Sequence, residues 1–176
     1  MAIETESTSY KSTDAVLLRD VAQSADARLQ AQLTSALAAD QRALVLAGFL
    51  VAAAVALVGG AVALRLSNPP QEYLSDVALS CAFGFLVGLA LCVFAARPTD
   101  WGYPGTRPEA WIKDITAQKA EEDRLAELCA DMQRKIGDNA ELMKWDGRLI
   151  IAAASMAGLS LTLSGLALVC FFGAHP

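Results

Sequence analysis

Few side chains in this sequence are of the types that usually perform catalysis. The single histidine, His175, lies one residue from the end of the 176-residue chain. Neither a Ser–His, a Cys–His nor an HExxH arrangement can be drawn around it, and no glycine-rich phosphate loop occurs. The carboxylates between residues 109 and 146 recur at the spacing of a solvated helix face. We therefore expect no enzyme, no metal site and no cofactor.

Three long apolar blocks account for much of the remaining sequence. Residues 43–64, 77–96 and 149–172 contain no Asp, Glu, Lys, Arg or His. A helix rises about 1.5 Å per residue, so each block spans about 30 Å or more, which is the thickness of a bilayer's hydrocarbon core. The sequence thus predicts an all-α membrane protein with three transmembrane helices, the third beginning at Arg148, and two long cytoplasmic helical extensions.

The basic residues indicate the orientation of these helices. Thirteen of the 14 Lys and Arg residues precede the first block or lie within residues 97–148, and only Arg65 lies between the first two blocks. The positive-inside rule places the basic side in the cytoplasm. We expect a multi-pass inner-membrane protein with no cleaved signal peptide and an external C-terminus. Acidic residues outnumber basic ones in both cytoplasmic segments, so nucleic acid is not an expected partner.

The segments on the predicted cytoplasmic side show helical periodicity. Residues 1–13 are rich in Ser and Thr and are expected to form a disordered tail, followed by an amphipathic helix over 14–42. A second amphipathic helix is predicted over 108–147, with ion pairs such as Glu121–Arg124 and Asp131–Lys135 on its polar face. Its apolar stripe is a candidate interface formed by Leu125, Leu128, Met132, Ile136 and Asn139. Asn139 either sets the register of a coiled coil or lies at a bundle edge open to water, and we expect the edge position.

Two irregular connections separate the predicted helices. The external loop over 65–76 contains "SNPPQEY", and its adjacent prolines cannot continue a helix. The connection over 97–107 is predicted to be an elbow at the membrane surface that turns the chain into the second cytoplasmic helix, and residues 173–176 form an external tail. Amphipathic aromatic rings favour the headgroup level, so the candidate interfacial anchors are Trp101, Tyr103, Trp111 and Trp145. The alternative is that Trp101, Tyr103 or Trp111 contacts a partner or a ligand.

Small residues recur at four-residue spacing in all three apolar blocks. They allow helix backbones to approach closely in lipid, where such packing largely replaces the hydrophobic effect. Two interpretations stay open: the three helices of one chain pack on one another, or separate copies associate. The candidate helix-packing residues are Ala52, Ala56, Gly60, Gly84, Gly88, Ala154, Gly158 and Thr162.

The order of these elements resembles a family of small bacterial membrane proteins. The segment "ADARLQAQLTSALAADQRALVLAG", which leads into the first block, and the step from Asn139 through Lys144 to Leu149 are similar to the transmembrane effectors of Pycsar anti-phage signalling systems. The resemblance covers about two-thirds of the chain and does not include the elbow. It implies that a cyclic nucleotide switches on damage to the inner membrane.

The predicted helices and the family resemblance are consistent with two functions. The first is a non-enzymatic inner-membrane protein that forms homo-oligomers through its helices and acts by assembly, with a membrane-perturbing or pore-forming defence effector as its sharpest form. The alternative is an accessory subunit or scaffold that binds a cytoplasmic or membrane partner through its amphipathic helices. The expected partners are therefore membrane lipid, further copies of the chain, and either a cyclic nucleotide or a protein.

Overall fold

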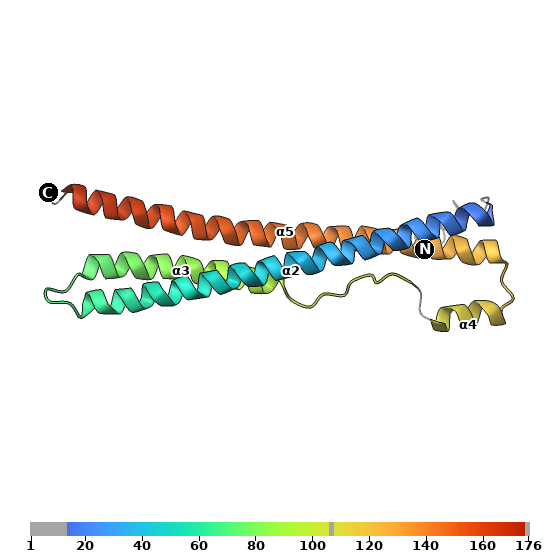
Figure 1. Cartoon of the computed structure of the whole chain (residues 1–176), viewed down its shortest axis with the longest axis horizontal. Helices are drawn as coiled ribbons and strands as arrows, with labels where there is room; N and C mark the ends of the chain where they lie inside the picture. Colours follow the sequence, from blue (N-terminus) through green and yellow to red (C-terminus); the bar gives the residue numbers. More distant parts are fainter. Residues whose placement is uncertain (1–13, 106–107, 175–176) are drawn as a thin grey trace. The chain divides into compact units, whose positions relative to one another are not determined.

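The computed structural model describes residues 14–105 and 108–174, and every regular element in this part of the chain is a helix. The helices are α2 (Ala15–Arg65), α3 (Glu72–Ala95), α4 (Pro108–Thr116) and α5 (Glu121–Ala174) (Figure 1). The predicted all-α class is confirmed for these residues. The expected disordered tail over 1–13 and His175 lie outside them.

Three of the helices have the composition of a membrane span. α2, α3 and α5 each contain a stretch that is long and apolar enough to cross a bilayer. The predicted number of such helices is therefore confirmed, and the protein has the features of a membrane protein. α2 has 51 residues and α5 has 54, so both continue well beyond their apolar blocks into polar sequence.

The beginning of α2 agrees with the prediction of a helix start near Asp14. The carboxylate of Asp14 accepts a hydrogen bond from the backbone N–H of Val16 at 3.2 Å, which satisfies one of the free donors of the first turn. No Gly or Pro follows until Gly48, so nothing in the sequence interrupts the helix before its apolar block. α2 is accordingly one continuous helix from the amphipathic segment through the first apolar block.

The connection between α2 and α3 is shorter than the loop predicted over 65–76. α3 begins at Glu72, before the second apolar block, because the helix needs only backbone hydrogen bonds and not apolar side chains. Arg65 closes the hairpin: its guanidinium donates to the Ser75 hydroxyl at 3.3 Å and pairs with Asp76. Residues 72–76 thus form a polar first part of α3 that precedes the apolar block.

The single amphipathic helix predicted over 108–147 is wrong, because the chain breaks between α4 and α5. Gln118 has a φ of 48°, in the left-handed region. Its N–H bonds to Ile115 O and the N–H of Lys119 bonds to Asp114 O, each at 3.1 Å. This pair of hydrogen bonds is a Schellman motif, which ends α4. α5 then starts afresh with Glu121 in its first turn, a favourable position for a negative charge.

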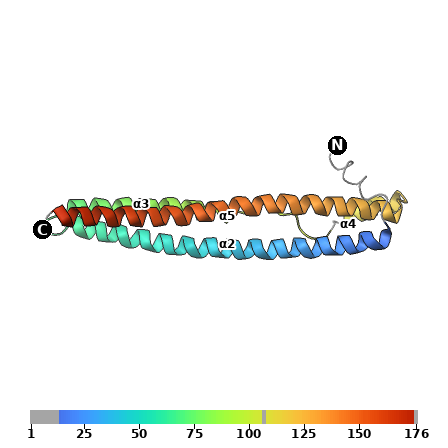
Figure 2. The same cartoon turned by 90° about the horizontal axis from the view of Figure 1, so that it is seen from above.

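The chain divides into two compact units, each with its own core. The polar unit comprises the described residues of Met1–Leu37 and Thr99–Lys144. Within it, the first half of α2 lies beside the first half of α5 (Figures 1 and 2). The core between them consists of Leu18, Ala22, Leu29, Leu125, Cys129, Met132 and Ile136.

The apolar unit comprises the described residues of Ala38–Pro98 and Trp145–Pro176. It contains the second half of α2, all of α3 and the second half of α5, with α2 and α3 running antiparallel (Figure 1). Five of the seven residues in its core are Ala or Cys, which have small side chains: the core consists of Ala47, Leu50, Ala54, Cys81, Phe85, Cys92 and Ala153. Such a core allows the close approach that helices need in lipid.

Candidate functional site

The glycine pair of α3 is used inside the chain. A Cβ added at Gly84 would lie 2.7 Å from Cβ of Ser160 on α5. A Cβ added at Gly88 would lie 3.2 Å from both Ala153 O and Leu50 Cδ1. Gly84 and Gly88 therefore let α3 pack closely against both other apolar segments, which is the first of the two interpretations of the small residues.

The other small residues lie on outer faces of the apolar unit. Gly60 and Gly158 have no atom within 4 Å of an added Cβ. With 3.6 residues per turn, Gly158 lies about 140° around α5 from buried Ala153, and Ala52 lies about 160° around α2 from buried Ala54. The residues exposed in this way are Ala52, Ala56, Gly60, Ala154, Gly158 and Thr162. We call them the outer small-residue faces of α2 and α5.

The predicted interface on the second amphipathic segment is occupied by the chain itself. Leu125, Met132 and Ile136 are buried against α2 in the polar core, and Leu128 packs against the same cluster. The side-chain amide of Gln32 on α2 also donates to Ile136 O at 3.1 Å. These apolar residues therefore form the contact between α2 and α5 within the chain.

Asn139 is buried, so its predicted position at a water-exposed bundle edge is wrong. Only 1% of the residue is exposed. Its side-chain amide faces the backbone of Gly102: Gly102 N donates to Asn139 Oδ1 at 2.8 Å, and Asn139 Nδ2 donates to Gly102 O at 3.0 Å. Both polar groups of the amide are paired, as a buried amide requires. The Asn139 side chain thus imitates a neighbouring strand of backbone.

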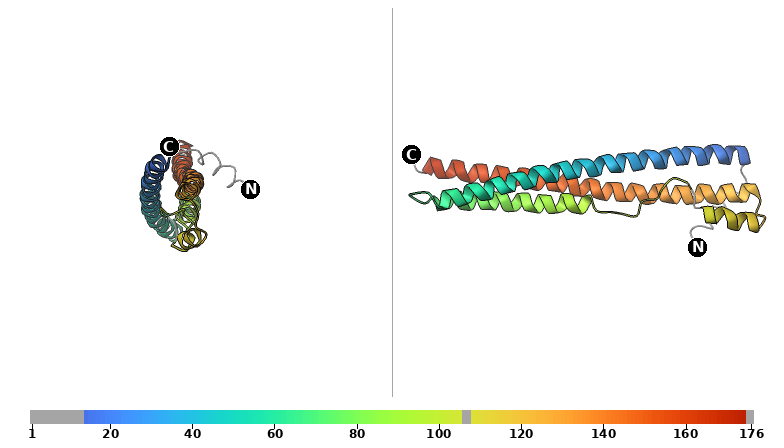
Figure 3. Two further views of the ribbon diagram at one scale, coloured as in Figure 1. Left: turned by 90° about the vertical axis from the view of Figure 1, so that its right-hand side faces the viewer. Right: turned by 60° about the horizontal axis from the view of Figure 1, so that its bottom comes forward.

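The predicted elbow is a docked segment rather than a simple turn. Residues 99–105, which we call the strap, have no helix or strand and lie beside α5 within the polar unit (Figure 3, right). Beyond Gly102, the strap is held at Gly105: its N–H donates to Asp26 Oδ1 at 3.0 Å, and Lys135 Nζ donates to its carbonyl at 3.1 Å. Neither interpretation made from the sequence, an elbow or an aromatic contact with a partner, anticipated this docking.

Both anchor positions of the strap favour glycine. A Cβ at Gly102 would lie 2.8 Å from Lys135 Cβ and 3.3 Å from Asn139 Oδ1. Gly105 has a φ of 81°, a conformation that other residues adopt at a cost. Two indications of this docking were present in the sequence: "GYPG", which is typical of a turn, and a lone Asn on an apolar stripe.

The predicted interfacial anchors fall in both units. Trp101 is half-buried and Tyr103 exposed on either side of Gly102 in the strap, and Trp145 is exposed at the start of the α5 part of the apolar unit. Trp111 belongs to α4, and its side chain lies outside the described part of the structure. Because Asn139 precedes the third apolar block by ten residues, it lies about 15 Å along α5 from that block. A location of all four aromatic residues at the headgroup level stays a prediction.

The ion pairs differ partly from those predicted. Asp131 pairs with Lys135 at 3.0 Å, as expected, but Glu121 pairs with Arg19 of α2. A hydrogen bond from Arg19, together with its positive charge, lowers the pKa of Glu121. Both of these side chains are at least half exposed, so the pair contributes little to the stability of the fold.

For two carboxylates of the apolar unit, the surroundings disfavour the negatively charged form and so raise the pKa. Burial raises the pKa of Asp146 on α5, the negative charge of Asp40 on α2 raises it further, and Arg97 lowers it. Burial also raises the pKa of Asp40. Both residues lie just outside the apolar blocks, so these charges mark the polar border of the predicted spans.

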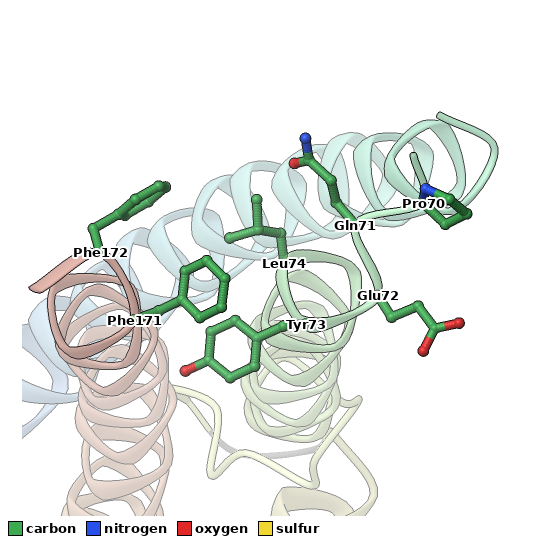
Figure 4. Close-up of a pocket in the computed structure, with 7 residues that line it drawn as sticks. All are labelled: Pro70, Gln71, Glu72, Tyr73, Leu74, Phe171 and Phe172. Atoms are coloured by element: carbon green, nitrogen blue, oxygen red, sulfur yellow. The ribbon is translucent and has the colours of Figure 1, made fainter. Parts of the chain in front are cut away.

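An open groove of about 510 Å³ lies where α3 begins, between Glu72, Tyr73 and the end of α5. The Tyr73 ring stacks on the Phe171 ring with centroids 4.5 Å apart, and the Tyr73 hydroxyl donates to Ala167 O at 3.0 Å. The carboxylate of Glu72 points away from this ring pair (Figure 4). The polar groups do not converge, so the groove is a contact between α3 and α5 rather than a ligand site.

No group of three or more metal-ligating side chains occurs among the residues that the structure describes. Comparison with protein-family models, with curated proteins and with solved structures gives no match to this chain. The structural features that bear on function are therefore the three membrane-span helices, the outer small-residue faces and the docked strap.

Proposed function

We propose that this is a non-enzymatic, multi-pass inner-membrane protein that acts by self-assembly of its helices in lipid, as a membrane-perturbing effector. The polar unit lies in the cytoplasm in this proposal, as the distribution of basic residues favours. The short α2–α3 hairpin, which holds only one basic residue, Arg65, then lies outside.

The observation that carries the proposal is the division of the small residues into two sets. Gly84 and Gly88 are used in packing within the chain, whereas the outer small-residue faces of α2 and α5 are exposed, and a Cβ added at Gly60 or Gly158 meets no atom within 4 Å. Lipid tails fill the space beside a small residue less well than another helix does, and small residues are enriched where membrane helices meet. Two such faces on different helices allow each copy to contact two neighbours, which produces rings or larger assemblies.

The test is a substitution that affects contacts between copies and spares contacts within the chain. Gly158→Leu places a large side chain where nothing lies within 4 Å, so the fold is expected to stay intact. Ala152→Leu is the matched control: it is also exposed on α5, about 120° around the helix from Gly158. Cross-linking in native membranes should show oligomers for the parent chain and for Ala152→Leu, and a clear loss for Gly158→Leu.

The effector form of the proposal has its own readout. Induced expression of the parent chain should depolarise the inner membrane, measured with a potential-sensitive dye, and Gly158→Leu should reduce the effect. Cross-linked oligomers without any change in potential would leave assembly standing and rule out membrane damage. Activation by a cyclic nucleotide is supported by the family resemblance alone, and is tested by adding cyclic nucleotides to the cross-linking reaction.

A scaffold function is the second candidate, and one observation favours it. Ile112 and Ile115 of α4 are 63% and 62% exposed, unlike the buried Ile136 of α5. A partner protein would therefore dock on α4 and not on the predicted stripe. Capture of one dominant partner by the parent chain, lost in Ile115→Asp but not in Thr116→Asp, would support this candidate over the effector.

A further inference from the structure

The strap differs from the rest of the polar unit in how it is held. The four hydrogen bonds described above join the backbone of Gly102 and Gly105 to side chains of α2 and α5. The cluster of buried apolar residues that holds α2 and α5 together includes no strap residue. The strap can therefore leave its place without opening the helix pair.

The chain order gives the strap a particular position. α2 and α5 each continue without a break from one unit into the other, whereas α3 ends at Ala95. Only residues 96–98 separate the end of α3 from the polar unit, which begins again at Thr99. On this side of the span, the chain therefore passes from α3 directly into the strap.

From these two observations we infer that the strap is a latch: docked on Asn139 it restrains α3, and its release frees α3 to shift against α2 and α5. Docking buries both polar groups of the Asn139 amide on Gly102, so a signal that competes for this amide or pulls on α4 opens the latch. This inference rests on the proposed function and deepens it, because release is then the step that converts a resting chain into one that assembles.

Two substitutions open the latch by different routes. Gly102→Ala adds a Cβ that collides with Lys135 and leaves α2 and α5 unchanged. Asn139→Leu removes both hydrogen bonds to the strap and places an apolar side chain on the stripe that continues from Ile136, so it leaves no unpaired polar group on α5. Gly137→Ala is the matched control, since a Cβ there meets nothing within 4 Å.

Docking of the strap is measured first, on the full-length protein in nanodiscs. Chymotrypsin cuts after Trp101, next to the docked Gly102, and Pro104 protects the bond after Tyr103. We expect slow cleavage in the parent and in Gly137→Ala, and cleavage at least tenfold faster in Gly102→Ala and Asn139→Leu with unchanged helix content. Fast cleavage in the parent chain would overturn the latch.

Restraint of α3 is measured by labelling Cys92, which lies one turn before the end of α3 and is fully buried. In a Cys170→Ser background, with labelled sites identified by mass spectrometry, a small membrane-permeant maleimide should modify Cys92 several-fold faster in both latch variants than in Gly137→Ala. If Cys92 stays protected although the bond after Trp101 is cut rapidly, the strap does not restrain α3 and the inference is wrong.

The link to assembly is the last measurement. Both latch variants should give more cross-linked oligomer than the parent, and Gly158→Leu should abolish the gain. Unchanged oligomer levels with a labelled Cys92 would overturn the activating role of the latch. If Gly158→Leu has no effect in any background, the proposed function fails, whereas Cys92 labelling still decides whether the strap restrains α3.

Discussion

Gly84 of α3 and Ser160 of α5 approach so closely that a Cβ at position 84 would lie 2.7 Å from the serine Cβ. The serine hydroxyl is satisfied within its own helix, by a 2.9 Å hydrogen bond to Met156 O, so it needs no other partner in lipid. The contact is one of shape, made possible by a missing side chain. It fixes the distance between α3 and α5.

We therefore predict that Gly84→Leu destabilises the folded chain. Overpacking a close contact costs about 1–3 kcal/mol, because the helices must separate to accept the new side chain. Thermal unfolding in detergent micelles should show a lower midpoint for Gly84→Leu and no change for Gly59→Leu, whose added Cβ meets nothing within 4 Å. Equal midpoints for the two variants would contradict the close packing of α3 on α5.

The sequence alone could not tell which glycines of the apolar blocks are buried and which are exposed. Gly84 and Gly158 both belong to four-residue repeats of small residues in charge-free blocks, but one is buried against a neighbour and the other is exposed. The three span-forming helices were predictable because solvation requires long uncharged helices in lipid. Which face of each helix turns inward depends on its neighbours, and the repeat alone does not specify that.

In the polar unit, too, some features could be predicted from the sequence and others could not. The continuous helix through α2 was predictable because no Gly or Pro occurs before Gly48. The break at Gln118 was not, because "TAQKAEED" contains neither residue, and a Gln in the left-handed region is uncommon. The docking of Gly102 on Asn139 joins residues 37 positions apart, so local periodicity carries no information about it.

A charge in the polar core should unfold that core. Ile136 is 7% exposed and belongs to the buried cluster between α2 and α5. Ile136→Asp buries a carboxylate without a partner and is expected to cost at least 3 kcal/mol. Hydrogen exchange of α2 residues 18–32 should become fast, whereas Gln133→Asp, on the exposed side of α5, should leave it unchanged. Protection retained in Ile136→Asp would show that this cluster does not hold the two helices together.

The stability of the apolar unit should depend on pH through Asp146. Because burial and the charge of Asp40 raise its pKa above the ordinary 3.8, the folded state binds the proton more tightly than the unfolded state. The folding penalty is absent below the ordinary pKa and fully present above the raised one, so stability falls as pH rises through that window. Asp146→Asn should raise the unfolding midpoint at neutral pH and flatten its decline across the window. A lower midpoint in Asp146→Asn at neutral pH would show that its charge is paired and favourable.

The Schellman motif at the end of α4 predicts a stabilising substitution. Gln118 has a φ of 48°, and glycine adopts this conformation without the steric cost that a Cβ imposes. Gln118→Gly should therefore stabilise α4 by up to about 1 kcal/mol, seen as slower hydrogen exchange at Lys119, whose N–H bonds to Asp114 O. Ala117→Gly, one residue earlier, is the control and should make the same exchange faster. A faster exchange in Gln118→Gly would contradict this ending of the helix.

The proposed orientation is tested by labelling from one side of the membrane. With the four native cysteines replaced by serine, Asn68→Cys lies in the α2–α3 connection and Gln133→Cys on the exposed side of the polar unit. In intact spheroplasts, a membrane-impermeant maleimide should label Cys at position 68 and reach position 133 only after lysis, because 13 of the 14 basic residues favour the cytoplasm for that side. Labelling of position 133 before lysis would place the strap and α4 outside the cell. In that case no cytoplasmic signal could open the latch.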